Sequence, residues 1–139
     1  MKIVLDTNVF ISGIFFTGPP YRILEAWRDR TLELVLSPEI LGEYRRVGSE
    51  LSTRYPTVDI TPFLEFAAQK GLMVSPEPLP DPVCEDADDD KFIACALAAA
   101  CDTVVSGDKH LLKVSGFHGI SVLTPREFVR RYLEGSTSP

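Results

Sequence analysis

Short apolar runs alternate along the chain with longer stretches that repeat apolar residues at helical spacing. The runs over residues 3–5, 32–36, 103–106 and 119–123 are rich in valine, isoleucine and leucine and have the length of buried strands. The stretches with helical spacing are residues 21–30, 38–47, 62–70, 90–100 and 125–133. This order predicts an α/β fold, with a mostly parallel central sheet between two layers of helices.

Local signals mark the ends of several of these helices. Ser37, followed by proline, is a predicted N-cap, and Thr124 and Glu127 have the spacing of a capping box. Gly71 stands where a glycine usually ends a helix, directly after residues 62–70.

Three segments have weaker patterns. Residues 49–56 fit a short helix or a loop, residues 72–75 a short strand, and the proline-rich residues 76–82 an extended surface crossing. The crossing is no domain boundary, because either half alone would lack enough sheet. We therefore expect a single domain over residues 1–134, followed by a frayed tail at 135–139.

Composition fits a globular protein of one domain. The chain has 139 residues, of which 45% are hydrophobic and 24% charged, and this allows an ordinary core. Cys84, Cys95 and Cys101 are odd in number and form no C-x-x-C pair, which argues against a disulfide framework or zinc site. The longest apolar run, residues 92–101, is too short to span a bilayer. These features predict a cytoplasmic protein with no membrane segment.

The net charge of −6 has a local origin. Residues 81–90 hold six of the 20 acids and no base, which leaves 14 acids against 14 bases elsewhere. If divalent metal occupies part of that cluster, the remaining charge does not exclude a phosphate-bearing substrate.

Four carboxylates are predicted to meet at one edge of the sheet. Asp6 and Asp108 follow two buried strands, and parallel strands end at the same edge. Asp90 opens the helix that leads to the strand before Asp108, and Glu43 faces inward less than two helical turns after another strand. Four oxygen donors without a nearby Cys or His set suit Mg²⁺ or Mn²⁺, which are ions of phosphodiester hydrolysis.

Over nearly its whole length the chain resembles the PIN domain family, small metal-dependent ribonucleases that include many toxins of toxin–antitoxin pairs. The resemblance rests on the segments LDTNVFISG, SPEILGEY, DDDKFIACALAAACDTVVSGDKHLL and LTPREF. It implies a PIN-like fold in which Asp6, Glu43, Asp90 and Asp108 form the catalytic acidic quartet around the metal. It also implies polar neighbours that orient ligands, water or phosphate, namely Thr7, Asn8 and Ser106.

One member of the quartet has a rival. The 18-residue step from Asp90 to Asp108 and the pattern D-x-x-I-A favour Asp90. Some relatives with a D-P-D-D run carry a non-acid at the position of Asp90, so Asp89 stays an alternative metal ligand beside Asp6 and Asp108. Ala87 stands where those relatives have proline.

The resemblance predicts a metal-dependent endoribonuclease, with RNA as substrate, a cognate antitoxin protein as partner and a homodimer as assembly. Two other classes stay open: a receiver-like phospho-acceptor domain, and a non-catalytic binding module with the same fold. Each acid also has a plainer explanation. Residues 88–90 suit a helix N-terminus, and Glu43 could lie on a solvated helix flank.

Overall fold

The computed structural model describes residues 1–134, so the predicted tail at 135–139 lies outside the described residues. One five-stranded sheet organises the fold, with all strands parallel and in the order β3-β2-β1-β4-β5. The strands are β1 (Lys2–Leu5), β2 (Glu33–Leu36), β3 (Leu72–Met73), β4 (Thr103–Val105) and β5 (Ser121–Leu123).

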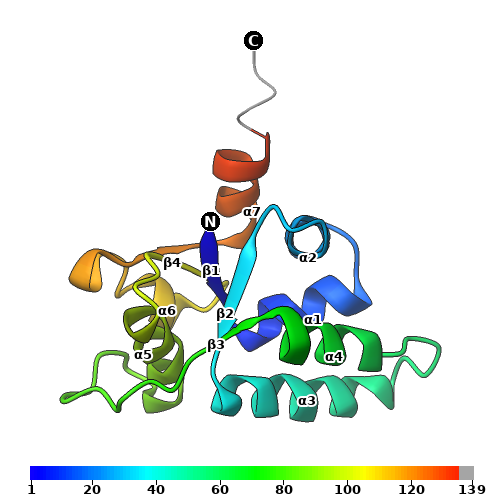
Figure 1. Ribbon diagram of the computed structural model, residues 1–139, viewed down its shortest axis with the longest axis horizontal. Helices are drawn as coiled ribbons and strands as arrows, with labels where there is room; N and C mark the ends of the chain where they lie inside the picture. The colour runs from blue at the N-terminus through cyan, green and yellow to red at the C-terminus, as the bar shows by residue number, and fades with distance from the viewer. Residues whose placement is uncertain (135–139) are drawn as a thin grey trace.

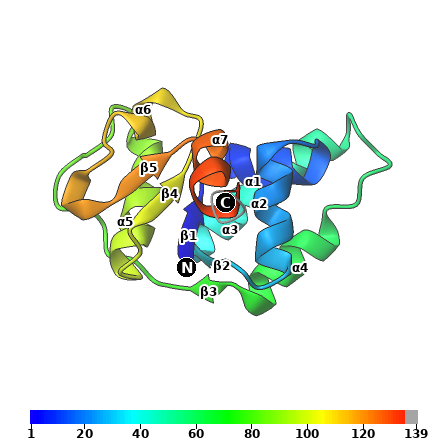
Figure 2. The same cartoon turned by 90° about the horizontal axis from the view of Figure 1, so that it is seen from above.

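Helices cover the sheet and confirm the predicted α/β/α class. Figure 2 shows α1, α2 and α4 together on one side of β1 and β2, with α5 on the other side. The α-helices are α1 (Thr7–Phe15), α2 (Pro19–Arg28), α3 (Pro38–Ser52), α4 (Thr61–Lys70), α5 (Asp90–Ala98), α6 (Lys109–Leu112) and α7 (Pro125–Phe128). The other helical segments are the 3₁₀ turns η1 (Ala87–Asp89) and η2 (Phe117–Gly119) and the π-helix η3 (Val129–Glu134).

The strand register brings the predicted acids to one edge. In β1, Leu5 is level with Val105 of β4, so the residues that follow these strands, Asp6 and Ser106, leave the sheet side by side. The carboxyl ends of β1 and β2 lie next to α1 and α3, the helices that follow them (Figure 1). Parallel strands therefore deliver the acids to the crevice where α/β sheets bind ligands.

The sequence pattern did not predict the short helix α6 or the longer helix α1. The α1 segment is apolar on nearly every side and contains β-branched residues and a glycine, so helical periodicity does not stand out. Gly13 allows α1 to approach α2, because a Cβ there would lie 2.7 Å from Leu24 Cδ1 and 2.8 Å from the carbonyl oxygen of Pro20. The longer missed helix is thus one that is buried by close contact with its neighbour.

Several element ends differ from the prediction. Helix α3 continues to Ser52, so part of the segment 49–56 is helical, and α5 ends at Ala98 because Ala100 has a left-handed φ of 52°. Gly71 does end α4, but its φ is −71° rather than left-handed. Its role is steric, since a Cβ there would lie 2.5 Å from Leu36 Cδ2.

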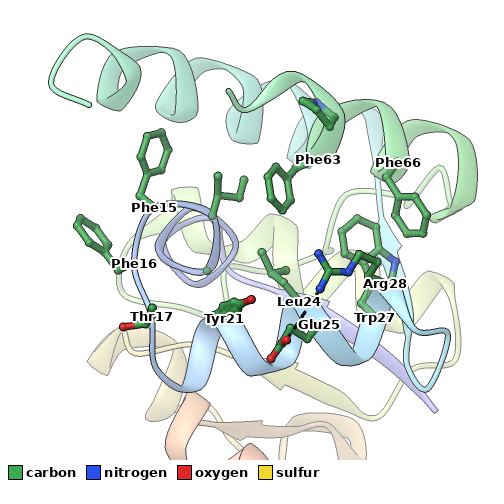
Figure 3. Close-up of a pocket in the computed structure, with 13 residues that line it drawn as sticks. Phe15, Phe16, Thr17, Tyr21, Leu24, Glu25, Trp27, Arg28, Phe63 and Phe66 are labelled. Atoms are coloured by element: carbon green, nitrogen blue, oxygen red, sulfur yellow. Dashed lines mark ion pairs between the residues drawn. The ribbon is translucent and has the colours of Figure 1, made fainter. Parts of the chain in front are cut away.

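An apolar groove of about 500 Å³ lies between α1, α2 and α4. Aromatic rings line much of it, with Phe63 reaching in from α4 and Tyr21 and Leu24 from α2 (Figure 3). Arg28 and Glu25 form an ion pair on its α2 wall. None of the acids predicted to form the site lines this groove.

Candidate active site

Asp6 is the buried centre of the site. It is 6% exposed and directly follows β1, where it caps the N-terminus of α1 by accepting the Asn8 backbone N–H at 3.3 Å on Oδ1. Burial raises the pKa of Asp6, and the negative charges of Asp108 and Glu43 raise it further, against hydrogen bonds that lower it. These three carboxylates therefore lie within electrostatic reach of one another.

Ser106 connects Asp6 to Asp108. The buried Ser106 hydroxyl donates to Asp6 Oδ2 at 2.5 Å and accepts the backbone N–H of Asp108 at 2.9 Å. Asp108 in turn accepts the backbone N–H of His110 at 2.7 Å on Oδ1 and caps α6. The two acids that end adjacent strands are thus held by one hydroxyl and two helix caps.

Glu43 points into the protein, as its position on α3 predicts. Its Oε1 accepts the Thr7 hydroxyl at 2.6 Å, and its Oε2 lies 2.5 Å from Lys91 Nζ. Lys91 Nζ also contacts Asp88 Oδ1 at 2.8 Å. Glu43 is therefore held by two donors of the chain and does not lie on a solvated flank.

Asp89 and Asp90 have different surroundings. The Asp90 carboxylate accepts the backbone N–H of Cys84 at 2.8 Å and of Val83 at 3.3 Å, which fixes the segment before η1. Asp89 is 8% exposed, and its Oδ2 is buried without a hydrogen-bond partner among the described residues. A buried polar atom with no partner in the chain is a candidate for binding a ligand.

The pKa of Asp89 is affected by the other acids of the region. Burial, and to a smaller extent the charges of Asp108, Asp86, Asp6 and Asp88, together raise the pKa of Asp89 to about 6. Burial and nearby negative charges both disfavour the charged form of a carboxyl group. Charge effects thus couple Asp6 with Asp89, Asp108 and Glu43, whereas both oxygens of Asp90 already accept backbone N–H groups.

The remaining polar residues predicted for the site take distinct positions. Thr7 is buried against Glu43, Ser106 is buried between Asp6 and Asp108, and Asn8 is exposed at the start of α1. His110, whose backbone N–H is bound by Asp108, has its Nδ1 3.0 Å from Glu85 Oε2. An amide at the surface is accessible to a substrate, whereas the two hydroxyls hold carboxylates.

The donor set fits a hydrated divalent ion. Within residues 1–134, no three Asp, Glu, His or Cys side chains form a ready-made metal cage. Mg²⁺ keeps several waters and needs only one or two carboxylates, unlike zinc or calcium in closed protein sites. The buried carboxylate of Asp89, which is affected by the charges of Asp108 and Asp6, has the chemistry to bind such an ion.

Two residues of the site were missed by sequence reasoning. Lys91 received no predicted role from the sequence, although its place directly after three aspartates was a signal. Tyr44 packs its ring on Phe10, with centroids 4.0 Å apart, and donates its hydroxyl to the Leu5 carbonyl at 2.6 Å. Tyr44 thereby holds the backbone of Leu5, the residue before Asp6. A hydrogen bond of this kind cannot be predicted from a sequence pattern.

Comparison with known proteins identifies the family of the chain. A family model described as "PIN domain" matches residues 2–110, a span that contains Asp6, Glu43, Asp89, Asp90 and Asp108. An uncharacterized protein of Methanocaldococcus jannaschii is 30% identical over 145 residues, covering 95% of this chain and 92% of that protein.

Among the described residues, no helix has the length and apolar character needed to cross a membrane.

Proposed function

Because the chain belongs to the PIN domain family, whose members are generally nucleases, we propose that it is a metal-dependent endoribonuclease that hydrolyses RNA phosphodiester bonds. The observation that carries the proposal is the link that Ser106 makes between Asp6 and Asp108 at the ends of β1 and β4, together with the buried Asp89 Oδ2, which has no hydrogen-bond partner among the described residues. Hydrolysis of this kind does not need a 2′-hydroxyl.

The residues of the chain have separate tasks in this proposal. Asp6, Asp89 and Asp108 would hold Mg²⁺ or Mn²⁺, which would supply polarisation of phosphoryl oxygens and a more acidic bound water. Ser106 orients Asp6 Oδ2, and exposed Asn8 is available to contact phosphate. Asp90 is assigned a structural task, so Asp89 replaces it in the proposed set of ligands.

The biological setting extends the same proposal. We propose that the enzyme is a homodimeric toxin paired with an antitoxin protein and that it acts in the cytoplasm. Its three cysteines, Cys84, Cys95 and Cys101, are all free and buried, which suits a reducing compartment.

The receiver-like alternative is disfavoured by the sheet. Receiver domains have the strand order 2-1-3-4-5, whereas β2 and β3 both lie on one side of β1 here. A non-catalytic binding module is therefore the alternative that the experiment must separate.

The test is cleavage of a panel of single-stranded and structured RNAs, with DNA of the same sequences, in Mg²⁺ or Mn²⁺ with and without chelator. Asp6→Asn should reduce metal-dependent cleavage by about a hundredfold or more, because a ligand at the centre of the site is lost. Asp29→Asn makes the same chemical change at an exposed position and should keep full activity.

Three results would count against the proposal. Equal cleavage by the wild type and Asp6→Asn would identify a contaminating nuclease. Cleavage that survives the chelator would remove the metal from the reaction. If the wild type cleaves none of the nucleic acids and calorimetry shows no metal binding, the non-catalytic binding module is favoured.

A further inference from the structure

A buried lysine lies inside the acidic region of the site. Lys91 sits in the first turn of α5, and only 6% of its side chain is exposed. Its Nζ bridges Glu43 Oε2 at 2.5 Å and Asp88 Oδ1 at 2.8 Å. A lysine is rarely buried to this extent unless its charge is paired, and here both partners are carboxylates.

The lysine leaves Glu43 with little capacity for another cation. One oxygen of Glu43 faces the ammonium, and the other accepts the Thr7 hydroxyl at 2.6 Å. A metal ion that bound Glu43 directly would have to displace the ammonium or share an oxygen with it, and two cations at one carboxylate repel each other. Among the described residues, the fully buried carboxylate oxygen without a hydrogen-bond partner is Oδ2 of Asp89, and the charges that act on this carboxylate include those of Asp108 and Asp6.

A direct contact between Lys91 and an RNA phosphate does not fit these observations. The ammonium is covered by the protein and already has two carboxylate partners. A polymer that reached it would have to break both ion pairs inside the protein, which is strongly unfavourable.

We propose that Lys91 is a positioning residue that acts as a built-in cation, holding Glu43 out of metal coordination and limiting the site to one divalent ion. The inference rests on the proposed function, because it concerns the same metal site. In this arrangement Lys91 stands where a second metal ion would otherwise neutralise Glu43, and Asp6, Asp89 and Asp108 bind the one ion.

The experiment is a titration of the purified full chain with Mn²⁺, in which free Mn²⁺ is measured by electron paramagnetic resonance. The wild type should bind one ion per chain. Lys91→Met removes the charge and keeps much of the side chain's length, so the released Glu43 should create a second site and raise the stoichiometry to two. Lys91→Arg keeps the charge and should return the stoichiometry to one.

The double variant K91M/E43Q tests whether the second ion is bound through Glu43. Because glutamine cannot supply the negative charge, this variant should bind one ion again. A folded K91M that binds one ion with unchanged affinity would overturn the inference, and so would a wild type that binds two.

Glu43→Gln alone keeps the test decisive if K91M does not fold, as judged by circular dichroism. The variant should still bind one Mn²⁺, because Glu43 is not a ligand of that ion, and loss of binding would overturn the inference. Failure of the proposed function gives a different result, namely a wild type that binds no Mn²⁺ at all.

Discussion

The Ser106 hydroxyl lies 2.5 Å from Asp6 Oδ2 and is also the acceptor for the backbone N–H of Asp108. At the ends of β1 and β4, which the sheet already pairs through the Asp6 N–H and the Val105 carbonyl, a single buried side chain thus contacts both acids. Its donor proton lowers the pKa of Asp6, in opposition to the larger effect of burial. Stability and site chemistry are therefore coupled at this serine.

Ser106→Ala should reduce both stability and metal binding. The substitution leaves the Asp108 N–H without its acceptor and Asp6 Oδ2 without its donor, so we expect the free energy of unfolding to fall by about 1–3 kcal/mol. Mn²⁺ affinity should fall by about tenfold or more because the two carboxylates are no longer fixed. Urea denaturation and Mn²⁺ titration measure the two effects.

Ser115→Ala is the matched control for this prediction. The Ser115 hydroxyl also accepts a backbone N–H, from Val122 at 2.9 Å, but touches no acid of the site. It should reduce stability and leave Mn²⁺ affinity unchanged. If Ser106→Ala behaves in the same way as Ser115→Ala, the serine has no role in the site.

Asp89→Asn and Asp90→Ala should have opposite effects on stability. The raised pKa of Asp89, about 6 against 3.8 for an ordinary aspartate, means that the fold disfavours its charge. The asparagine variant should therefore be more stable at pH 7, by about 1–2 kcal/mol once screening by solvent is allowed for. Asp90→Ala removes the acceptor of the Val83 and Cys84 backbone N–H groups. The free energy of unfolding should therefore fall by about 2 kcal/mol.

The pH dependence of stability tests whether the gain in the Asp89→Asn variant comes from the loss of the Asp89 charge. Between about pH 4 and pH 6 the folded wild type keeps a proton that the unfolded chain has lost, so its free energy of unfolding falls as pH rises. The advantage of Asp89→Asn should thus be absent at pH 4 and complete above pH 6 or so. An advantage of equal size at both pH values would show that the charge of Asp89 is not its cause.

Metal binding should release protons from Asp89. At pH 6 this carboxyl is about half protonated, and a metal ligand must be deprotonated, so each Mn²⁺ bound should release about half a proton. Calorimetry in two buffers with different ionisation enthalpies measures that number, which should fall at pH 7. Asp89→Asn should lower the number of protons released per bound ion, and the remainder would come from Asp6, whose pKa burial also raises. An unchanged number in this variant would show that Asp89 is not a source of the protons.

Much of the fold was predictable because burial leaves a periodic pattern. The strands before Asp6 and Asp108 and the helix that carries Glu43 follow from apolar runs and capping residues, and their parallel order brings the acids to one edge. Helix α1 was not predictable from periodicity, because it is apolar around most of its circumference. A pattern of amphipathic faces cannot reveal a helix that has hardly any polar face.

The detail of the site was less accessible for a different reason. Asp89 and Asp90 are neighbours of the same type, and their tasks depend on which carboxylate meets the N–H groups of Val83 and Cys84. That contact is made by a segment whose path is set by tertiary packing. The same holds for Lys91, whose partner Glu43 lies on another helix, 48 positions earlier in the chain.

Gly13 and Gly42 offer a matched test of the packing that holds α1. Both are helical, but a Cβ at Gly13 would lie 2.7 Å from Leu24 Cδ1 and 2.8 Å from the Pro20 carbonyl oxygen, whereas a Cβ at Gly42 would meet no atom within 4 Å. Gly13→Ala should destabilise by about 1–3 kcal/mol, because backbone cannot move aside as a flexible side chain can. Gly42→Ala should stabilise by about 0.5–1 kcal/mol, because alanine loses less conformational freedom in a helix. Thermal denaturation of the two variants should therefore shift the midpoint in opposite directions, and a shift in the same direction would contradict the close contact between α1 and α2.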